Sequence, residues 1–430
     1  MDASQLLTHL AQFDAQKAIV SKNKSITFSE LIAQIREISE TWRRQYHAQQ
    51  ILLLKGKYSI NTIAAFFAAL EAGFHLVLAP RDLCFTTDDV FWSYQINFSS
   101  DKINLIQQGK SQKPQKLLAL EHKGEAALIL LTSGSEGPSK QVMYSFQDFI
   151  MDYLHRSAKN LVTVPVMPFD HFGGLDVCLR VLCSGGTLVI PEISQPAEIF
   201  RAAEDHRANF LSATPSFFRM ALAAGIPVLH PLPDLRWINL GAEAIAPALI
   251  RRLSQVFPQA EIRQTFGTTE SGVVAMSNSG TESLTAIKNG MRITNGSLQV
   301  KRHPAFLGYL NQDDPGEYIS TNDLAEENTG SFRILGRSSR IINTGGEKVH
   351  PEVVEAVLLE HPKIQEVRVF AEPHPLLGQI ICAEVLTEEK GADLRTELRK
   401  HCRERLLPHQ VPVKFRFSAK IGISNRWKKK

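Results

Sequence analysis

Short apolar segments, each long enough for one buried strand, recur along the first 240 residues and are separated by helix-like stretches. They lack the polar alternation of a strand with one solvated face, so they are typical of parallel sheets covered by helices on both sides. Strands that alternate with helices along a chain build layered α/β domains. The pattern therefore predicts an α/β fold with largely parallel sheets, whose strands include residues 51–54, 76–78, 127–131, 187–190 and 237–240.

Two helices of this first region can be placed by their boundary residues. Residues 62–70 form an apolar helix that Gly73 ends, because glycine readily adopts the left-handed angles that close a helix. An amphipathic helix begins near Ser29, whose hydroxyl can accept a hydrogen bond from a free backbone amide, so Ser29 is the predicted N-cap.

The pattern changes near residue 296 to short alternating segments separated by turns, which are typical of antiparallel strands. The 430 residues are too many for one compact core. We expect a large N-terminal domain, residues 1–338, and a small α+β C-terminal domain, residues 339–430. The smaller domain should contain helices at 352–359 and 393–406 and strands at 367–370, 380–386 and 413–417.

Composition argues against several classes of function. The formal charge is only +4, and the one dense basic run is 428–430, so no nucleic-acid partner is expected. Five cysteines without a Cys-x-x-Cys pair predict buried thiols in a reducing compartment. The N-terminus does not resemble a signal peptide, and no apolar run reaches about 18 residues. We therefore expect a cytoplasmic protein without a membrane span.

A loop rich in glycines and hydroxyls, TSGSEGPSK, follows the strand at 127–131. Glycines let backbone N–H groups approach phosphate oxygens closely, hydroxyls add donors, and the final lysine adds a positive charge. The Walker A pattern is absent, which disfavours an ordinary P-loop NTPase. A plain solvated turn is the alternative. The candidate polyphosphate ligands are Thr132, Ser133, Gly134, Ser135, Gly137 and Lys140.

This loop resembles the phosphate-binding signature of the adenylate-forming superfamily, which includes acyl-CoA synthetases, peptide-synthetase adenylation domains and luciferases. Pro138 and Ser139 are exchanged relative to that signature, while Lys140 keeps its place. The compact chain is similar to small stand-alone members such as o-succinylbenzoate–CoA ligases. The resemblance implies a large N-terminal domain of layered α/β subdomains with a β-rich subdomain, followed by a small mobile α+β C-terminal domain.

A second motif, QTFGTTE at residues 264–270, resembles the family's aromatic-Gly-x-Thr-Glu signature. It implies that Phe266 stacks on adenine with Gly267 also in the cofactor site, that Thr269 lies near the α-phosphate and the acyl carboxylate, and that Glu270 binds Mg²⁺. One glutamate is sufficient, because Mg²⁺ is commonly held by one or two carboxylates together with phosphate oxygens.

Further segments resemble the nucleotide site in the same order. Gly241, Ala242 and Glu243 resemble the adenine-binding turn. Asp323 corresponds to the aspartate that accepts both ribose hydroxyls, and Arg337 to a ribose or phosphate contact. Asn322 replaces the usual glycine before Asp323, and asparagine also tolerates left-handed backbone angles, so the turn can be kept.

The segment 168–174 resembles the one that lines the acyl pocket, and Gly173 lies within it. His171 is the candidate gate of this pocket, with a helix-start histidine of no special role as the alternative. Asp170 stands where amino-acid-activating members bind the substrate's amino group. We favour Asp170 as an N-cap instead.

The remaining matches lie in the C-terminal domain. Ser339 stands at the family's hinge, and Gly345 and Gly346 would permit a pantetheine arm to approach closely. The catalytic lysine of the family aligns with Lys428, although a shifted alignment would place Arg426 there. A disordered basic tail is the alternative.

The resemblance implies an enzyme that uses ATP and Mg²⁺ to activate a small carboxylic acid as its acyl-adenylate, with coenzyme A as the acceptor. One alternative is transfer to the phosphopantetheine of an acyl carrier protein. A second is a degenerate, non-catalytic nucleotide-binding homologue, which the departures at Asn322, Ser339 and Trp427 keep open.

Overall fold

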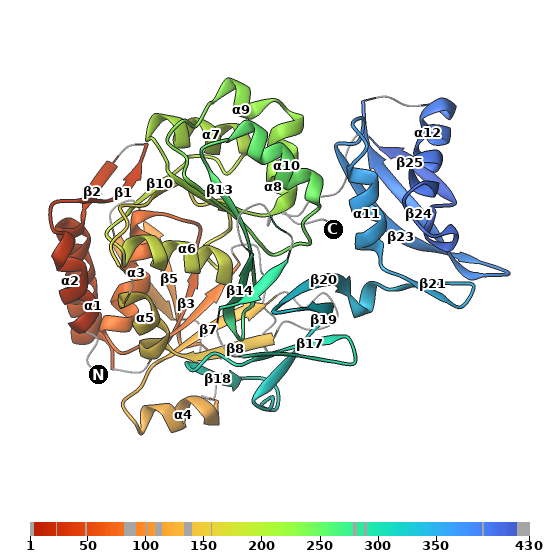
Figure 1. Cartoon of the computed structure of the whole chain (residues 1–430). Coiled ribbons are helices and arrows are strands. Elements are labelled where there is room, and N and C mark those ends of the chain that lie inside the picture. The colour runs from red at the N-terminus through yellow and green to blue at the C-terminus, as the bar shows by residue number, and fades with distance from the viewer. Residues whose placement is uncertain are drawn as a thin grey trace.

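The computed structural model describes residues 4–22, 24–47, 50–80, 92–99, 102–107, 114–132, 140–155, 157–277, 281, 283–287, 290–388 and 391–418. Figure 1 shows a large body, which extends to β20 (Ser331–Arg337), and a smaller body beside it, which runs from β21 (Ile342–Thr344) to β25 (Lys414–Ser418). The 3₁₀ helix η3 (Ser338–Arg340) connects the two along the chain. This is the predicted mixed α/β architecture with a large and a small part.

One sheet of the large body has seven strands among the described residues, in the order β18-β8-β7-β4-β3-β5-β6. Its central strands β3, β4 and β7 are parallel neighbours, and every residue of β4 is buried. The predicted strands of this region are confirmed. The bounds are β3 (Ile51–Lys55), β4 (His75–Ala79), β5 (Tyr94–Ser99), β6 (Lys102–Gln107), β7 (Ala127–Thr132), β8 (Lys140–Ser145) and β18 (Phe306–Tyr309).

A second sheet has thirteen strands in the described part of the chain, in the order β16-β17-β19-β20-β15-β14-β13-β12-β11-β9-β10-β1-β2. Strand β13 joins a parallel half to an antiparallel half, because it pairs with β12 on one side and with β14 on the other. The bounds are β1 (Lys17–Ser21), β2 (Lys24–Thr27), β9 (Val162–Thr163), β10 (Thr187–Ile190), β11 (Phe210–Ala213), β12 (Trp237–Leu240), β13 (Glu261–Thr268), β14 (Gly272–Ser277), β15 (Leu284–Ala286), β16 (Met291–Thr294), β17 (Ser297–Lys301) and β19 (Tyr318–Asn328).

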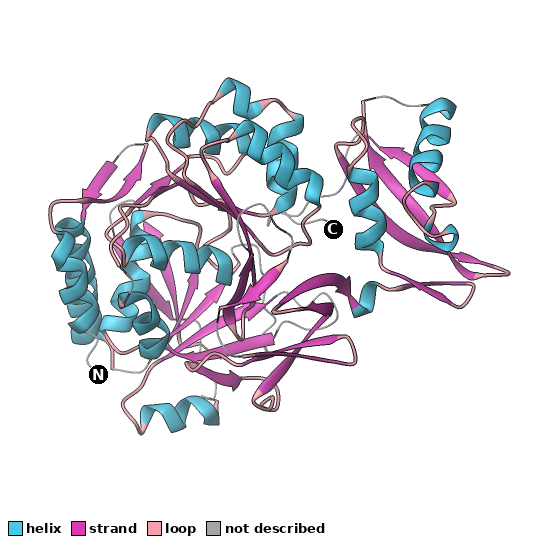
Figure 2. Ribbon diagram, in the orientation of Figure 1, coloured by secondary structure: helices cyan, strands magenta, loops and turns pink. Residues whose placement is uncertain are grey.

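Helices cover these sheets, as Figure 2 shows. The largest buried cluster joins apolar side chains of five helices, among them Leu7, Ile35, Phe66, Phe149 and Leu179. The helices of the large body are α1 (Ser4–Leu10), α2 (Phe28–Gln45), α3 (Ile60–Glu71), α4 (Gln115–Glu121), α5 (Phe146–Leu154), α6 (Phe172–Leu182), α7 (Pro196–Asp205), α8 (Pro215–Ala223), α9 (Ile226–Leu229) and α10 (Pro247–Val256).

Helix boundaries in the first region agree with the sequence in one case and differ in another. Gly73 follows α3 with a left-handed φ of 75°, as predicted. The predicted cap of α2 is wrong, because Ser29 lies inside the first turn and Thr27 is the N-cap. The Thr27 side chain accepts from the Glu30 amide, and the Glu30 carboxylate accepts from the Thr27 amide. This reciprocal capping box satisfies two amides that would otherwise lack partners.

The small body has five strands in the part that the structure describes, and two helices lie on one face of this sheet. All five elements predicted for it are confirmed to within a few residues. Its core includes Val354, Val367, Leu398 and Cys402. The further bounds are β22 (Glu347–Val349), α11 (Pro351–Leu359), β23 (Glu366–His374), β24 (Gly378–Leu386) and α12 (Ala392–Arg403).

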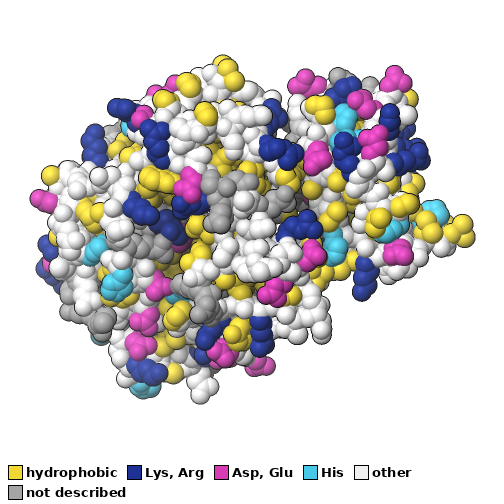
Figure 3. Space-filling model, in the orientation of Figure 1, with side chains coloured by type: hydrophobic (Ala, Val, Ile, Leu, Met, Phe, Trp, Pro, Cys, Tyr) yellow, Lys and Arg dark blue, Asp and Glu magenta, His cyan; other side chains and the backbone are white. Residues whose placement is uncertain are grey.

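Two general expectations can be compared with the described residues. Cys178, Cys183, Cys382 and Cys402 are buried thiols, as predicted, whereas Cys84 lies outside the described residues. Among the helices described, none is long and apolar enough to cross a membrane. On the face shown in Figure 3, Lys and Arg side chains are interspersed with Asp and Glu.

Candidate active site

The two ends of the glycine and hydroxyl loop are held by adjacent strands. β7 ends at Thr132 and β8 begins at Lys140, and these two residues are partners in the antiparallel ladder. The Thr132 hydroxyl also donates to the Lys140 carbonyl at 3.5 Å. Lys140 therefore has a defined position at the base of the loop, while Ser133, Gly134, Ser135 and Gly137 lie outside the described residues.

Strand β18 places Tyr309 next to Lys140. Tyr309 pairs with Val142 on β8, so Lys140, two residues along, points to the same face and is its diagonal neighbour. The Lys140 Nζ lies 5.2 Å from the centre of the Tyr309 ring, within the range of a cation–π contact.

Tyr309 also contacts the second motif. Its hydroxyl donates a 2.8 Å hydrogen bond to Oε1 of Glu270, and both residues are buried. Burial and the negative charge of Glu270 raise the pKa of the Tyr309 hydroxyl well above its ordinary value, so this group stays protonated as the donor. One tyrosine thus links the phosphate-loop lysine to the predicted Mg²⁺ ligand.

The turn that carries Glu270 joins β13 to β14 and is tightly built. The Thr268 and Ser271 side chains each accept from the other's backbone amide at 3.2 Å. Gly267 packs so closely that an added Cβ would lie 2.2 Å from the Gly272 carbonyl oxygen. Thr269 precedes Glu270 in this turn and is half-buried. Because the turn is held by these contacts, its backbone fixes the positions of both predicted site residues.

The predicted adenine turn lies beside the same strand. Gly241 follows β12, and the last residue of β12 pairs with Gln264 of β13. The Gly241 amide donates to the Ala213 carbonyl at 3.2 Å. A Cβ at Gly241 would approach the Thr265 hydroxyl to 2.9 Å. Ala242 has a left-handed φ of 68°. The Gly241 turn therefore contacts β13 at Thr265, directly before the half-buried Phe266.

Glu243 in this turn is anchored to helix α8. Its Oε2 accepts from the Ser216 amide at 3.1 Å and from the Ser216 hydroxyl at 2.7 Å. Its Oε1 is buried and has no hydrogen-bond donor among the described residues.

Asp323 and Arg337 form an ion pair. They are ladder partners on β19 and β20, and Arg337 Nε lies 2.9 Å from Asp323 Oδ1. The Asp323 side chain is only 10% exposed, whereas that of Arg337 is 50% exposed. Asn322 has a left-handed φ of 59°, so the prediction that asparagine preserves this turn is confirmed.

The predicted acyl-pocket segment leads into α6. His171 is the N-cap residue, and its side chain makes no capping hydrogen bond. The prediction that Asp170 is the N-cap is therefore wrong, and Asp170 is instead a buried carboxylate one residue earlier. Gly173 packs against Met167, whose Sδ would lie 2.9 Å from an added Cβ. Phe172 brings this segment near Glu270, since its ring would lie 3.6 Å from a Cβ at Gly272.

The predicted residues of the small body lie apart from this site or outside the described residues. Gly345 and Gly346 have left-handed φ values in the turn between β21 and β22, and Figure 1 places β21 away from β13 and β14. Ser339 is exposed within η3. Lys428 and Arg426 lie outside the described residues.

Lys140 lies near the buried Glu270 through Tyr309, and the Gly241 turn lies beside the strand that leads to Glu270, in a large α/β body that carries a small α+β body. These features define a two-part nucleotide-binding protein. The chain belongs to the AMP-binding enzyme family, whose model matches residues 8–324. A model of the AMP-binding enzyme C-terminal domain matches residues 353–422.

Known relatives of this chain include CoA ligases. The chain is 25% identical to the oxalate–CoA ligase of Saccharomyces cerevisiae over 72% of this chain and 62% of that enzyme. It is 24% identical to the 2-succinylbenzoate–CoA ligase of Bacillus licheniformis over 97% of this chain and 96% of that enzyme. The chain spans less than two thirds of the length of the yeast enzyme and of two other CoA ligases that it matches.

A solved structure shows the same fold. The o-succinylbenzoate CoA synthetase of Bacillus subtilis, in complex with its acyl-adenylate intermediate, superposes with a TM-score of 0.78 at 20% identity. The match covers 99% of this chain and 96% of that one. The shared fold therefore includes both the large and the small body.

Proposed function

We propose that this protein is an AMP-forming ligase, which activates a carboxylic acid with ATP and transfers the acyl group to the thiol of coenzyme A. The observation that carries this proposal is the Lys140–Tyr309–Glu270 cluster, which joins a phosphate-loop lysine to a metal-type carboxylate. The names of relatives that are CoA ligases support the same conclusion.

The residues present fit an Mg²⁺ ion. Oε1 of Glu270 accepts from Tyr309, and no described residue pairs with Oε2. A single carboxylate oxygen beside phosphate oxygens suits Mg²⁺, which retains several waters. The ion would neutralise charge on the phosphates, and Glu270 would hold it there.

In the proposed reaction, a carboxylate oxygen of the acid attacks the α-phosphorus of ATP, and pyrophosphate leaves. The acyl-adenylate then reacts at its carbonyl carbon with a thiol, which loses its proton to solvent, while AMP leaves. Positioning and charge neutralisation dominate such chemistry. Lys140 would hold the β- and γ-phosphates, Phe266 and the Gly241 turn the adenine, and Asp323 the ribose.

The ion pair between Arg337 and Asp323 bears on the ribose assignment. An aspartate that accepts both ribose hydroxyls needs both oxygens. We propose that Arg337 releases part of this contact and turns toward the phosphate when nucleotide binds. Thr269 would contact the α-phosphate, and Lys428 would stabilise charge on the reacting oxygens.

We further propose a domain boundary at residues 338 and 339, with Ser339 in η3 as the hinge. Rotation there would bring Gly345 and Gly346 to the adenylate for the thiol step. A cytoplasmic location is part of the proposal, because the four described cysteines are thiols, which suits a reducing compartment.

Product analysis tests the acceptor and the acid. The protein is incubated with ATP, Mg²⁺, a panel of fatty, aryl and amino acids, and either coenzyme A or a holo acyl carrier protein. The proposal predicts AMP and an acyl-CoA that depend on one class of acid, with His171 and Gly173 lining its pocket. Transfer only to the carrier protein would contradict coenzyme A as the acceptor.

The variant Asp170→Ala separates the two acid classes. Activity with plain fatty or aryl acids should persist, whereas activity with an amino acid should be lost if Asp170 binds its amino group. Loss of both, in a variant that still unfolds cooperatively near the wild-type temperature, would contradict a role limited to substrate choice.

A further inference from the structure

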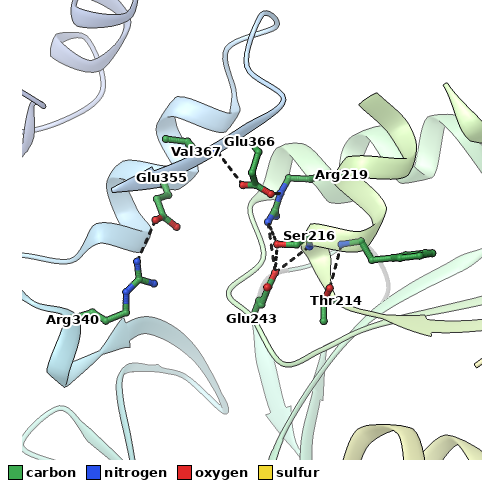
Figure 4. Close-up of polar contacts among 9 residues, drawn as sticks. Thr214, Ser216, Arg219, Glu243, Arg340, Glu355, Glu366 and Val367 are labelled. Atoms are coloured by element: carbon green, nitrogen blue, oxygen red, sulfur yellow. Dashed lines mark hydrogen bonds and ion pairs between the residues drawn. The ribbon is translucent and has the colours of Figure 1, made fainter. Parts of the chain in front are cut away.

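Arg219 on α8 lies at the centre of a buried charge cluster that joins the two bodies, as drawn in Figure 4. Its Nε donates to Oε2 of Glu366, the first residue of β23, at 2.7 Å. Its Nη2 donates to the Ser216 hydroxyl at 2.8 Å and lies 3.6 Å from Oε2 of Glu243. One guanidinium therefore contacts the small body and the adenine-type turn together.

The position of Arg219 is fixed by its helix. The Thr214 hydroxyl caps α8 by accepting from the Phe217 amide at 3.2 Å. Ser216 and Arg219 lie three residues apart, so both side chains project from the same face. The Ser216 hydroxyl accepts from Arg219 and donates to Glu243, which relays the position of the arginine to the turn.

The charges of this cluster are removed from water. The side chains of Arg219 and Glu366 are 8% and 2% exposed. The second oxygen of Glu366 accepts from the Val367 amide at 3.0 Å, so the carboxylate is held in place by its own strand. Desolvation offsets much of the attraction in a buried pair, and such pairs contribute little to stability compared with apolar packing. Their strict geometry makes them better suited to specifying one orientation.

An exposed pair at the same boundary provides a contrast. Arg251 on α10 and Glu360, just after α11, also come from the large and the small body, but their atoms are 3.9 Å apart. Their side chains are 63% and 34% exposed, so this pair is expected to contribute little.

We propose that Arg219 is a positioning residue that couples the orientation of the small body to nucleotide binding at the Gly241 turn. This inference rests on the proposed function, which assigns adenine to that turn. With Glu366 docked, Arg219 is held against Ser216, and Ser216 and Arg219 hold Glu243. When the small body turns away, Arg219 loses its strongest acceptor and the turn is less well fixed.

The coupling is reciprocal, because an orientation that favours nucleotide is equally favoured by it. ATP therefore stabilises the orientation described here. The cluster thus links occupancy of the adenine turn to the position of a body that contributes no described residue to that turn.

Nucleotide affinity measured by calorimetry tests the inference without relying on turnover. ATP and AMP are titrated into the full-length wild type, Glu366→Gln, Arg219→Met, the double variant, and Glu360→Gln as the matched control. Glu366→Gln should weaken nucleotide binding about tenfold, within the usual range for coupled sites. Glu360→Gln should stay within twofold of the wild type. The double variant should be no weaker than Arg219→Met, since both changes interrupt one path.

Each result has a separate meaning. Equal affinities of Glu366→Gln and Glu360→Gln would overturn the coupling and leave the proposed function intact. If the double variant lost nucleotide affinity by the product of the two single effects, the coupling would be overturned as well. A wild type that binds neither nucleotide would overturn the proposed function and this inference with it. Thermal unfolding of each variant identifies any loss of affinity that reflects loss of fold.

Discussion

The hydroxyl of Tyr309 donates a 2.8 Å hydrogen bond to the carboxylate of Glu270, in a site where both side chains are buried. Lys140 lies over the same ring. Strand β18 carries Tyr309 to this position by pairing with β8, so the strand that begins at Lys140 also fixes the tyrosine. The two motifs read from the sequence are therefore parts of one site.

Tyr309→Phe should raise the Mg²⁺ concentration that activity requires, because the variant lacks the hydroxyl that orients Glu270. The phenylalanine ring still lies beneath Lys140, so that contact is retained. Changes to groups that orient a metal ligand typically cost about 10- to 100-fold in metal affinity or activity. The measurement is adenylate formation as a function of Mg²⁺ concentration. Tyr318→Phe is the control, since that ring contacts Arg292 instead. An unchanged Mg²⁺ dependence would contradict the role given to Tyr309.

Lys140→Ala should raise the KM for ATP about tenfold or more and lower kcat, because the lysine is assigned to the phosphates that leave as pyrophosphate. The KM for the acid should change little. Steady-state kinetics of pyrophosphate release measure both. Lys24→Ala, which changes an exposed side chain at the start of β2, should leave both constants unchanged. If only the KM for the acid changed, Lys140 would act on the acid and not on the phosphates of ATP.

Gly267→Ala should abolish most adenylate formation, because the new Cβ would lie 2.2 Å from the Gly272 carbonyl oxygen and displace the turn that carries Glu270. A shift of about 1 Å can cost roughly 100-fold in rate. Gly316→Ala is the matched control, since no atom lies within 4 Å of its added Cβ. Full activity of Gly267→Ala would show that the turn tolerates displacement.

Asn322 allows the left-handed turn before Asp323 to be tested by a pair of substitutions. Asn322→Ala should destabilise the fold by about 1 kcal/mol, because a left-handed φ is costly for alanine, whereas Asn322→Gly should be nearly neutral. Denaturant unfolding measures this difference. The KM for ATP should rise in the alanine variant, since Asp323 follows directly. Equal stabilities of the two variants would contradict the argument from backbone angle.

The sequence predicted much of the fold because its signals are local. The continuous apolar run at residues 127–131 indicates a buried strand, and the helix expected at 352–359 is present as α11. The left-handed turn at Asn322 can be predicted because asparagine tolerates left-handed backbone angles. Thr27 was missed although the spacing Thr-x-x-Glu to Glu30 could have revealed it. Asp170 was misassigned because the true N-cap, His171, makes no capping hydrogen bond that a pattern could indicate.

The contacts missed entirely join distant segments. Tyr309 has no pattern of its own, and its partners are fixed only by the pairing of β18 with β8. Arg219 and Glu366 are separated by 147 residues, and nothing in their neighbourhoods indicates that they meet. Such pairs depend on how whole elements pack, which local sequence does not contain.

Exchange of labelled pyrophosphate into ATP tests the central claim most directly, because it reports the reversible formation of an acyl-adenylate without any thiol acceptor. The account predicts exchange that requires Mg²⁺ and one class of carboxylic acid, and that falls to background in Glu270→Gln. Absence of exchange with every acid, from a folded protein that binds ATP, would contradict it and favour a non-catalytic nucleotide-binding homologue.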